Sequence, residues 1–336
     1  MRVVSLLPAG TEIVAALGSF DTLVGVSHEC DYPAAVSALT RVSASAVDAE
    51  ASGREIDAAV RARAASGAPV FTLDADEIRR LAPTLILTQA LCEVCAVSEG
   101  EVRAVADVLS PPPRVLPLVG TTIQGVWEDM MRVGEAIGRA SEARALLASL
   151  DARMRRVHET LAAARAPKPR VAVIEWLDPL FTAGHWTPEL VRRAGGIDVL
   201  AEPGSHSHVI EVDQVRAASP TLLLFAPCGF NVTRAELEAR ALLDDPAWLW
   251  ARGLEAWALD GNALTSRPGP RLADAVEVMA AIFAPALFEA PDARYARRLG
   301  AARTTSDMRM EAVVLSSAAP LDGHLGRSLP RRRGGD

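Results

Sequence analysis

Short apolar runs alternate with longer helical segments along most of the chain, and this alternation constrains the fold more than any other feature. Continuous apolar runs of this length are typical of strands buried on both faces of a parallel sheet. Helices are expected between them, including Thr11–Leu17 after a Pro-Ala-Gly turn, Glu189–Ala194 and Asp213–Ala218. The alternation therefore predicts an α/β fold. The predicted strands are Val3–Leu7, Leu23–Val26, Leu85–Thr88, Val115–Leu118, Val171–Glu175, Leu222–Phe225 and Ala256–Leu259.

The two sets of strands are separated by Ile123–Arg165, a segment rich in Ala, Leu, Glu and Arg that contains no proline. We expect Gly138–Ser141 to divide it into two helices, with Ser141 as the N-cap of the second. At 1.5 Å per residue the second helix would be about 40 Å long, enough to run the height of a two-lobed protein. The expected parts are an N-terminal lobe (1–122), a connecting helical segment (123–168) and a C-terminal lobe (169–299).

Two segments stand outside this alternation. Residues 43–69 are rich in Ala and Ser and are expected to form a surface excursion that is inserted into the first lobe. Residues 300–336 lack helical or strand periodicity, are dominated by Ser, Ala, Gly, Pro and Arg, and are expected to be a disordered tail.

Composition excludes several function classes. An apolar fraction of 50% allows real cores, and 336 residues fit two domains. The net charge of -7, with no basic face before the last few residues, speaks against nucleic-acid binding. No run reaches the roughly 18 apolar residues that span a bilayer. Because the N-terminus leads straight into a core strand, the expected location is cytoplasmic, or periplasmic if the true start lies upstream.

Side chains suited to chemistry gather just past the predicted strands. All four cysteines and four of the six histidines lie there, as do Trp176 and Trp186. In open parallel sheets ligands bind beyond the carboxyl ends of the strands, so these loops are expected to share one face. Aromatic rings, thiols and imidazoles together are suited to a large flat ligand that contains a metal.

Cys92 and Cys95 form a C-x-x-C pair. Such a pair is a half-site for a soft metal, a redox dithiol, or simply two small buried side chains on one helical turn. A zinc-finger site needs a second close pair of ligands, whereas Cys30 and Cys228 are far apart in the sequence. The four cysteines are expected to be thiols rather than structural disulfides.

Motifs of other function classes are absent from the sequence. There is no G-x-G-x-x-G after a predicted strand and no G-x-x-x-x-G-K-[ST], so nucleotide binding has no support. There is also no G-x-S-x-G elbow of the kind that serine hydrolases use.

Several motifs, in their order and spacing, resemble class III solute-binding proteins, which serve ABC importers of vitamin B12 and iron chelates. The clearest are Val3–Glu12 (VVSLLPAGTE), Cys30–Pro33 (CDYP), Leu81–Leu87 (LAPTLIL) and Arg267–Arg271 (RPGPR). The resemblance covers residues 2–299. It implies two Rossmann-like lobes with parallel sheets, joined by a single long backbone helix, with the ligand held between loops of both lobes.

The resemblance is greatest to the cobalamin-binding members of that family, so the chain looks like a member without an export signal. By position, Tyr32 and Arg267 match ligand-contacting residues, and Trp176–Asp178 matches a contacting loop. The Gln89–Cys95 loop replaces one that carries an aromatic contact. The four cysteines and the inserted residues 43–69 depart from the family pattern.

Three hypotheses follow. The first is a solute-binding protein, not an enzyme, that holds a corrinoid such as cobalamin between its lobes. The second is a binder of a transition metal ion, haem or an iron chelate that uses Cys and His as ligands. The third is a thiol-dependent enzyme that processes corrinoids. For the first, the expected partners are the small-molecule ligand and an importer permease, and the protein is expected to be a monomer.

These hypotheses specify the site residues. The expected ligand-binding residues are Pro8, Thr11, Glu12, His28, Glu29, Tyr32, Gln89, Trp176, Asp178, His185, Trp186, His206 and Arg267. The expected metal ligands are His28, Cys30, Cys92, Cys95, His185 and Cys228.

Overall fold

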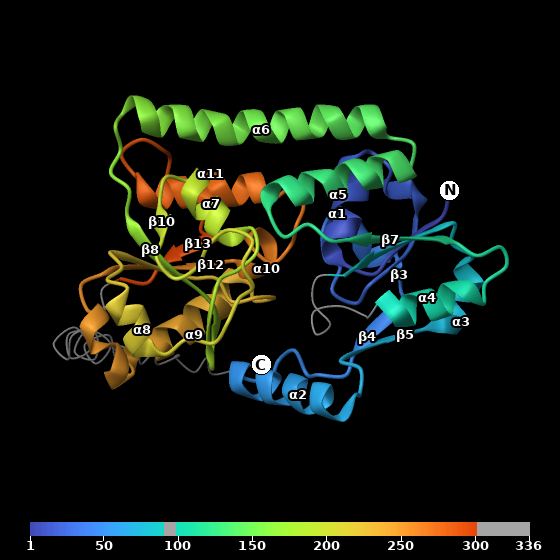
Figure 1. Cartoon of the computed structure of the whole chain (residues 1–336), viewed down its shortest axis with the longest axis horizontal. Coiled ribbons are helices and arrows are strands. Elements are labelled where there is room, and N and C mark those ends of the chain that lie inside the picture. Colours follow the sequence, from blue (N-terminus) through green and yellow to red (C-terminus); the bar gives the residue numbers. More distant parts are fainter. Residues whose placement is uncertain (91–98, 301–336) are drawn as a thin grey trace, which may run out of the picture.

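A computed structural model of the protein describes residues 1–90 and 99–300, and in it each lobe is built around a central sheet (Figure 1). The N-terminal lobe has a five-stranded sheet in which every neighbouring pair is parallel. In sheet order its strands are β3 (Thr40–Arg41), β2 (Leu23–Val26), β1 (Val3–Ser5), β6 (Leu85–Gln89) and β7 (Arg114–Leu118). Its helices include α1 (Pro8–Ala16), η1 (Phe20–Thr22), η2 (Ala34–Ala38), α3 (Ala75–Leu81) and α4 (Glu99–Asp107).

The C-terminal lobe has a six-stranded mixed sheet. Strands β10, β8, β11 and β12 are parallel, whereas β9 and β13 are antiparallel to their neighbours. The strands are β10 (Ile197–Asp198), β8 (Arg170–Leu177), β9 (Leu180–Thr182), β11 (Leu222–Phe225), β12 (Glu255–Leu259) and β13 (Ala296–Arg298). The helices are α7 (Thr187–Arg193), α8 (Val212–Ala217), α9 (Val232–Asp244), η3 (Pro246–Ala251), α10 (Gly261–Leu264) and α11 (Leu272–Phe283).

Both faces of these sheets are buried, as continuous apolar runs require. In β1, Val3 packs into one hydrophobic cluster and its neighbour Val4 into another on the opposite face. The predicted fold class, with parallel sheets in two lobes, is therefore present. The predicted turn at Pro8 is wrong, because this proline is the first residue of α1, where its missing N–H costs no hydrogen bond.

The connecting segment forms two helices, α5 (Ile123–Ala136) and α6 (Ala140–Ala163). The chain turns between them at Gly138, whose φ is 73°. The predicted cap at Ser141 is wrong, because α6 already begins at Ala140 and has no side-chain cap. With 24 residues, α6 is about 36 Å long and runs along both lobes (Figure 1).

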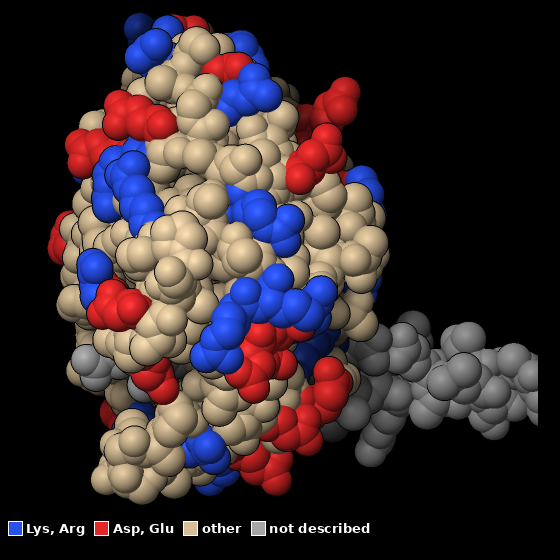
Figure 2. Space-filling model, turned by 90° about the vertical axis from the view of Figure 1, so that its right-hand side faces the viewer, with Lys and Arg blue, Asp and Glu red and all other residues tan. Residues whose placement is uncertain are grey.

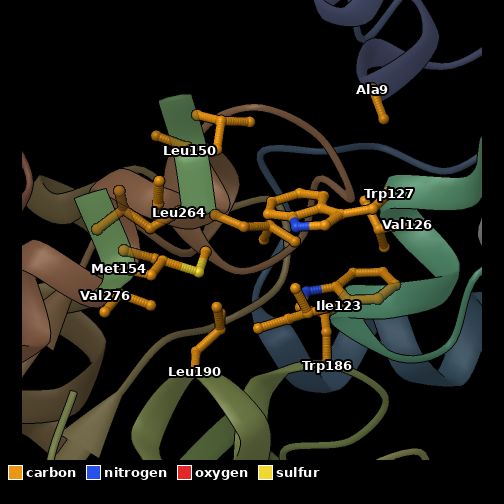
Figure 3. Packing of buried hydrophobic residues seen from close by; sticks show 14 of the residues in the cluster. Ala9, Ile123, Val126, Trp127, Leu150, Met154, Trp186, Leu190, Leu264 and Val276 are labelled. Atoms are coloured by element: carbon orange, nitrogen blue, oxygen red, sulfur yellow. The ribbon is translucent and has the colours of Figure 1, made fainter. Parts of the chain in front are cut away.

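One hydrophobic cluster joins the two lobes beside α6. It includes β1 and α1 of the first lobe, α5 and α6, and α7 and α11 of the second. Figure 3 shows Ile123, Trp127 and Trp186 pointing into the same packed region as Leu150 and Leu264. This side of the lobe boundary is therefore closed by buried apolar packing.

The inserted segment crosses from one lobe to the other. It leaves the N-terminal lobe at β4 (Ser43–Ser45), contains α2 (Gly53–Ser66) and returns at β5 (Phe71–Leu73), which pairs antiparallel with β4. We call residues 46–70 the strap. Figure 1 shows α2 on the side of the molecule opposite α6, beside the boundary between the lobes. The sequence predicted the excursion but not that it would reach the other lobe.

Charged side chains are mixed on the surface. Figure 2, which views the molecule from the side of the N-terminal lobe, shows basic and acidic side chains interspersed among uncharged ones. Among the described helices, none has the length and apolarity that crossing a membrane requires. The predicted tail lies outside the described residues from residue 301 onward.

Candidate functional site

The described loops that follow the central strands bring many of the predicted site residues to the lobe boundary. In the N-terminal lobe these are the start of α1 and the loop after β2, and in the C-terminal lobe they are the loops after β8, β11 and β12. Gln89 is half-buried at the end of β6, and Pro8 is half-buried at the start of α1.

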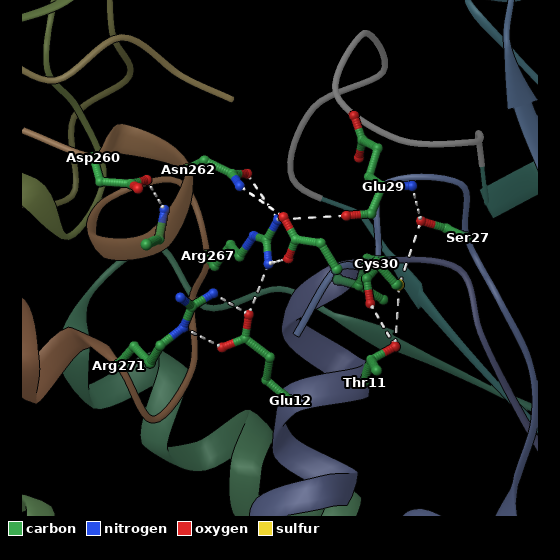
Figure 4. Close-up of polar contacts among 12 residues, drawn as sticks. Thr11, Glu12, Ser27, Glu29, Cys30, Asp260, Asn262, Arg267 and Arg271 are labelled. Atoms are coloured by element: carbon green, nitrogen blue, oxygen red, sulfur yellow. Dashed lines mark hydrogen bonds and ion pairs between the residues drawn. The ribbon is translucent and has the colours of Figure 1, made fainter. Parts of the chain in front are cut away.

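Arg267 makes a buried bridge between the lobes (Figure 4). Only 4% of its surface is exposed, and its Nη1 donates to Oε1 of Glu12 at 3.0 Å. Its Nη2 donates to Oδ2 of Asp31 at 2.9 Å and to Oδ1 of Asn262 at 2.8 Å. Arg271 adds a second cation, since its Nε donates to Oε2 of Glu12 at 2.8 Å. We call these five residues the Arg267 bridge.

The charges within the Arg267 bridge cancel. Glu12 and Asp31 come from the first lobe and carry two negative charges, and the two arginines come from the second. Burial alone would raise the pKa of Asp31, but hydrogen bonds from Arg267 and Asn262 outweigh it and hold this pKa below its usual value. The side chain of Asp31 is 55% exposed, so a carboxylate and not a guanidinium is presented at the surface of the bridge.

Tyr32 lies beside this bridge. It is 48% exposed, and the guanidinium of Arg271 lies 4.6 Å from the centre of its ring. The side chain of Glu29 is exposed, while its backbone carbonyl accepts a bond from Arg267 at 3.4 Å.

Cys30 is a buried thiol and not an open ligand. It is 1% exposed, and its Sγ lies 3.2 Å from Oγ1 of Thr11 and 3.6 Å from Oγ of Ser27. Burial raises the pKa of the Cys30 thiol above its usual value. Because the thiolate is the form that binds metals, this position does not fit the predicted role of Cys30 as a metal ligand.

His28 is held in one orientation. Its Nδ1 lies 2.8 Å from Oγ of Ser43, and its ring centre is 5.3 Å from that of Phe71. Burial, helped by the charge of Arg41, lowers the pKa of His28, so the imidazole is neutral near pH 7. A neutral imidazole whose Nδ1 is fixed by a hydrogen bond is suited to ligate a metal through Nε2.

Trp176 lies at the end of β8 and contacts the strap. Its ring centre is 5.1 Å from that of Phe230, and its Nε1 donates to the backbone carbonyls of Asp178 at 3.1 Å and Gly53 at 3.3 Å. Asp178 in turn pairs with Arg54 of the strap at 2.8 Å. Two predicted ligand contacts, Trp176 and Asp178, therefore also bind the inserted segment.

Trp186 is not a plate at the surface. It is 6% exposed within the cluster that joins the lobes, and its Nε1 donates to the backbone carbonyl of Thr265 at 2.7 Å. The prediction that it lies against a ligand ring does not fit this position. His185, which has a φ of 54°, packs on Trp186 and lies 5.1 Å from the exposed ring of His206.

The predicted metal ligands do not come together in the described residues 1–90 and 99–300. Within these ranges no group of three or more His, Cys, Asp or Glu could hold a metal ion. Cys30 is buried in the first lobe, whereas Cys228 is exposed on the loop after β11. Cys92 and Cys95 lie outside the described residues. Within the described residues, His28, His185, Cys30 and Cys228 therefore do not form a metal-binding group of three or more.

Comparison with known proteins identifies the family. The model of a family of periplasmic binding proteins matches residues 3–249. The chain belongs to this family. The family resemblance seen in the sequence motifs is thereby confirmed.

Solved structures share the fold of this periplasmic binding protein. A periplasmic haem-binding protein from Pseudomonas aeruginosa has 22% identity and a TM-score of 0.66, and the match covers 90% of this chain and 98% of that one. The periplasmic vitamin B12-binding protein of Vibrio cholerae has 22% identity and a TM-score of 0.55, and the match covers 85% of this chain and 97% of that one. An ABC-transporter substrate-binding protein from Listeria monocytogenes has 17% identity and a TM-score of 0.61 over 84% and 98%. None of the curated proteins matches.

Family membership bears on two other expectations. The family consists of binding proteins and not of enzymes, in line with the first hypothesis. It is described as periplasmic, so the expected cytoplasmic location receives no support.

Sequence reasoning did not assign Asn262, Arg271, Phe230 or Arg234 to the site. Each contacts a residue of the other lobe or of another loop. Asn262, for example, donates a hydrogen bond to Asp31. Arg271 is the last residue of the RPGPR motif, and this motif is the sequence signal that could have identified Arg271.

Proposed function

We propose that the protein binds a corrinoid such as cobalamin at the boundary between its lobes, and delivers it to an importer permease. Family membership supports the transport role, and the loops of both lobes supply aromatic, amide and carboxylate groups there. The choice of a corrinoid over haem rests on the charges of the Arg267 bridge.

The observation that carries the choice is the neutral balance of the Arg267 bridge. Haem has two carboxylate side chains, whose burial requires free cations. The corrin ring is instead surrounded mainly by uncharged amides, which both donate and accept hydrogen bonds. The two terminal nitrogens of Arg267 are already bonded to Glu12 and Asp31, and Asp31 presents an acceptor. This arrangement favours amides over carboxylates.

His28 is the proposed residue nearest the metal of the bound ligand. Its Nδ1 is held by Ser43, which would leave Nε2 free to face the ligand beside the cobalt. Glu29, Tyr32 and Gln89 of the first lobe would contact the periphery of the ring, together with Trp176 and His206 of the second.

Haem is the second candidate, because several similar solved structures are haem-binding proteins, including one in complex with two haems. Titration of the purified, reduced protein with cyanocobalamin and with haemin, followed by visible absorption, separates the two. We expect a saturable change with cyanocobalamin at one equivalent, reduced in His28→Ala. Saturable binding of haemin alone would replace the corrinoid proposal.

A metal ion by itself is tested in the same preparation. Titration of the reduced protein with zinc, read by calorimetry, includes Cys92 and Cys95 in the test. Stoichiometric tight zinc binding that is lost on replacing both cysteines with serine would favour the metal-binding hypothesis over the corrinoid.

A further inference from the structure

The strap is attached at one end and docked at the other. Its base is closed by the β4–β5 pair and by a hydrogen bond from the backbone N–H of Ala46 to the carbonyl of Val70 at 2.9 Å. All of these residues belong to the N-terminal lobe. The contacts of the far end of the strap are made instead with the C-terminal lobe, through Trp176, Asp178 and Arg234.

A stack of three side chains in the C-terminal lobe receives the strap. The ring of Phe230 packs against Trp176, and the guanidinium of Arg234 lies 3.6 Å from the ring centre of Phe230. Arg234 also donates to the backbone carbonyls of Ala49 and Ala51, the latter at 2.5 Å. The stack therefore recognises the backbone of the strap rather than its side chains.

Little apolar surface is buried in this docking. Of the residues of α2, Gly53 alone is fully buried, and Ile56 is partly buried against the core of the second lobe. The ion pair of Arg54 with Asp178 is exposed, with 78% and 48% of the two side chains accessible. Exposed pairs of this kind contribute little to stability, so the docking depends mainly on the bonds from Arg234.

The helix of the strap is complete without the C-terminal lobe. Ser52 and Glu55 form a capping box at its start, and Gly67 ends it in the left-handed conformation with a φ of 70°. Because both ends are satisfied locally, α2 can leave the second lobe as a formed helix. The strap would then move about its β4–β5 base without any unfolding of the lobes.

The other contacts between the lobes, namely the buried apolar cluster and the Arg267 bridge, offer no such release because they are buried. We propose that the strap is a gate, which undocks from Trp176, Phe230 and Arg234 to let a ligand enter and leave the space between the lobes. This gate assignment rests on the proposed site between the lobes. It makes Trp176 a contact shared by the strap and the ligand.

The test uses Arg234→Ala, with Arg240→Ala as a matched control. Arg240 lies on the same helix, pairs with Glu236 and donates to the carbonyls of Arg298 and Leu299, but it does not contact the strap. If the ligand enters and leaves only while the strap is undocked, its association and dissociation rates are both proportional to the undocked population. We expect Arg234→Ala to speed both association and dissociation of cyanocobalamin about tenfold in stopped-flow absorption, with a much smaller change in Kd. Arg54→Ala, on the strap itself, should speed both about twofold.

Hydrogen exchange of the full chain without ligand gives an independent measurement. We expect faster exchange in peptides from residues 46–70 of Arg234→Ala, and exchange as in the wild type in Arg240→Ala. If cyanocobalamin does not bind but haemin does, the kinetic test is made with haemin. If neither binds, the proposed function fails, and the gate is judged by exchange alone.

Two results would overturn the gate. One is unchanged association and dissociation rates in Arg234→Ala, although its strap exchanges faster. The other is strap exchange that is the same in Arg234→Ala and Arg240→Ala, because the contacts described here would then not hold the strap.

Discussion

The two bridges between the lobes are built in opposite ways. The Arg267 bridge is made of charged side chains, and its central guanidinium is 4% exposed. The strap is held by bonds to its backbone and by an ion pair whose arginine is 78% exposed. A buried charge without its partner is costly, whereas an exposed pair is replaced by water at little cost. The first bridge is therefore suited to fix the lobes, and the second to open.

The largest expected effect is that of breaking the buried bridge. Arg267→Met removes a buried cation, so that Asp31 keeps only the amide of Asn262 and Glu12 keeps only Arg271, which should lower the free energy of unfolding by about 3–5 kcal/mol. Urea denaturation at pH 7 measures it. Arg294→Met is the control, since Arg294 pairs with Asp292 at an exposed site and should change stability by less than about 0.5 kcal/mol. Equal losses in both variants would show that burial of the bridge does not matter.

Asp198 adds to the comparison, because its partly buried carboxyl is bonded to backbone N–H groups and not to a cation. Its Oδ1 accepts from the backbone of Leu200 and Ala201, while Oδ2 has no partner in the structure. Burial raises the pKa of Asp198 to about 7. The folded state therefore holds a proton that the unfolded state loses near pH 4, and stability should fall as the pH rises from about 4 to 7.

Asp198→Asn removes this loss. We expect the variant to equal the wild type near pH 4 and to be more stable by about 2 kcal/mol at pH 8, a figure reduced from the full shift because Asp198 is only partly buried. Unfolding in urea at both pH values is the measurement. A variant that is no more stable than the wild type at pH 8 would show that the unpaired carboxyl carries no cost.

Much of the fold follows from the sequence alone. The apolar runs predicted β2 and β11 to the residue, because a strand buried on both faces leaves an uninterrupted signal. Helix ends were less certain. Ser141 has the chemistry of a cap, yet α6 starts one residue earlier, because the turn at Gly138 sets where helical geometry begins.

The candidate site followed from the sequence only in part. The sequence correctly predicted that Arg267 and Trp176 lie at the lobe boundary, because the topology of a parallel sheet decides where the loops after its strands lie. It could not tell that Arg267 would be occupied by Glu12, a residue 255 positions away. Nor could it distinguish Trp186, which is a core residue, from Trp176, since both follow strands predicted from the sequence and only their tertiary packing separates them.

Acid should weaken the Arg267 bridge from its exposed end. The pKa of Asp31 lies below its usual value, so its contribution to stability is present above about pH 4 and is lost as the pH falls through the folded-state pKa. Asp31→Asn should cost about 1 kcal/mol at pH 7, because Asp31 is half-exposed, and less at a pH below the folded-state pKa of Asp31. Urea unfolding across this range tests it. A loss that is the same at both pH values would mean that the charge of Asp31 is not what binds Arg267.

The smallest effect on the free energy of unfolding is expected at the strap. Arg54→Ala removes the exposed pair with Asp178 and should lower global stability by less than about 0.5 kcal/mol, because an undocked strap leaves both lobes folded. Because exposed pairs are screened, even this difference should vanish in 1 M salt, where the Debye length is about 3 Å. Arg103→Ala, which breaks an exposed pair with Glu99 inside α4, is the control for losing such a pair away from the strap. Urea unfolding at low and high salt measures both variants. A loss above about 1 kcal/mol in Arg54→Ala alone would mean that the strap unfolds together with the lobes, and that the two bridges are not the fixed and the releasable contact that their burial implies.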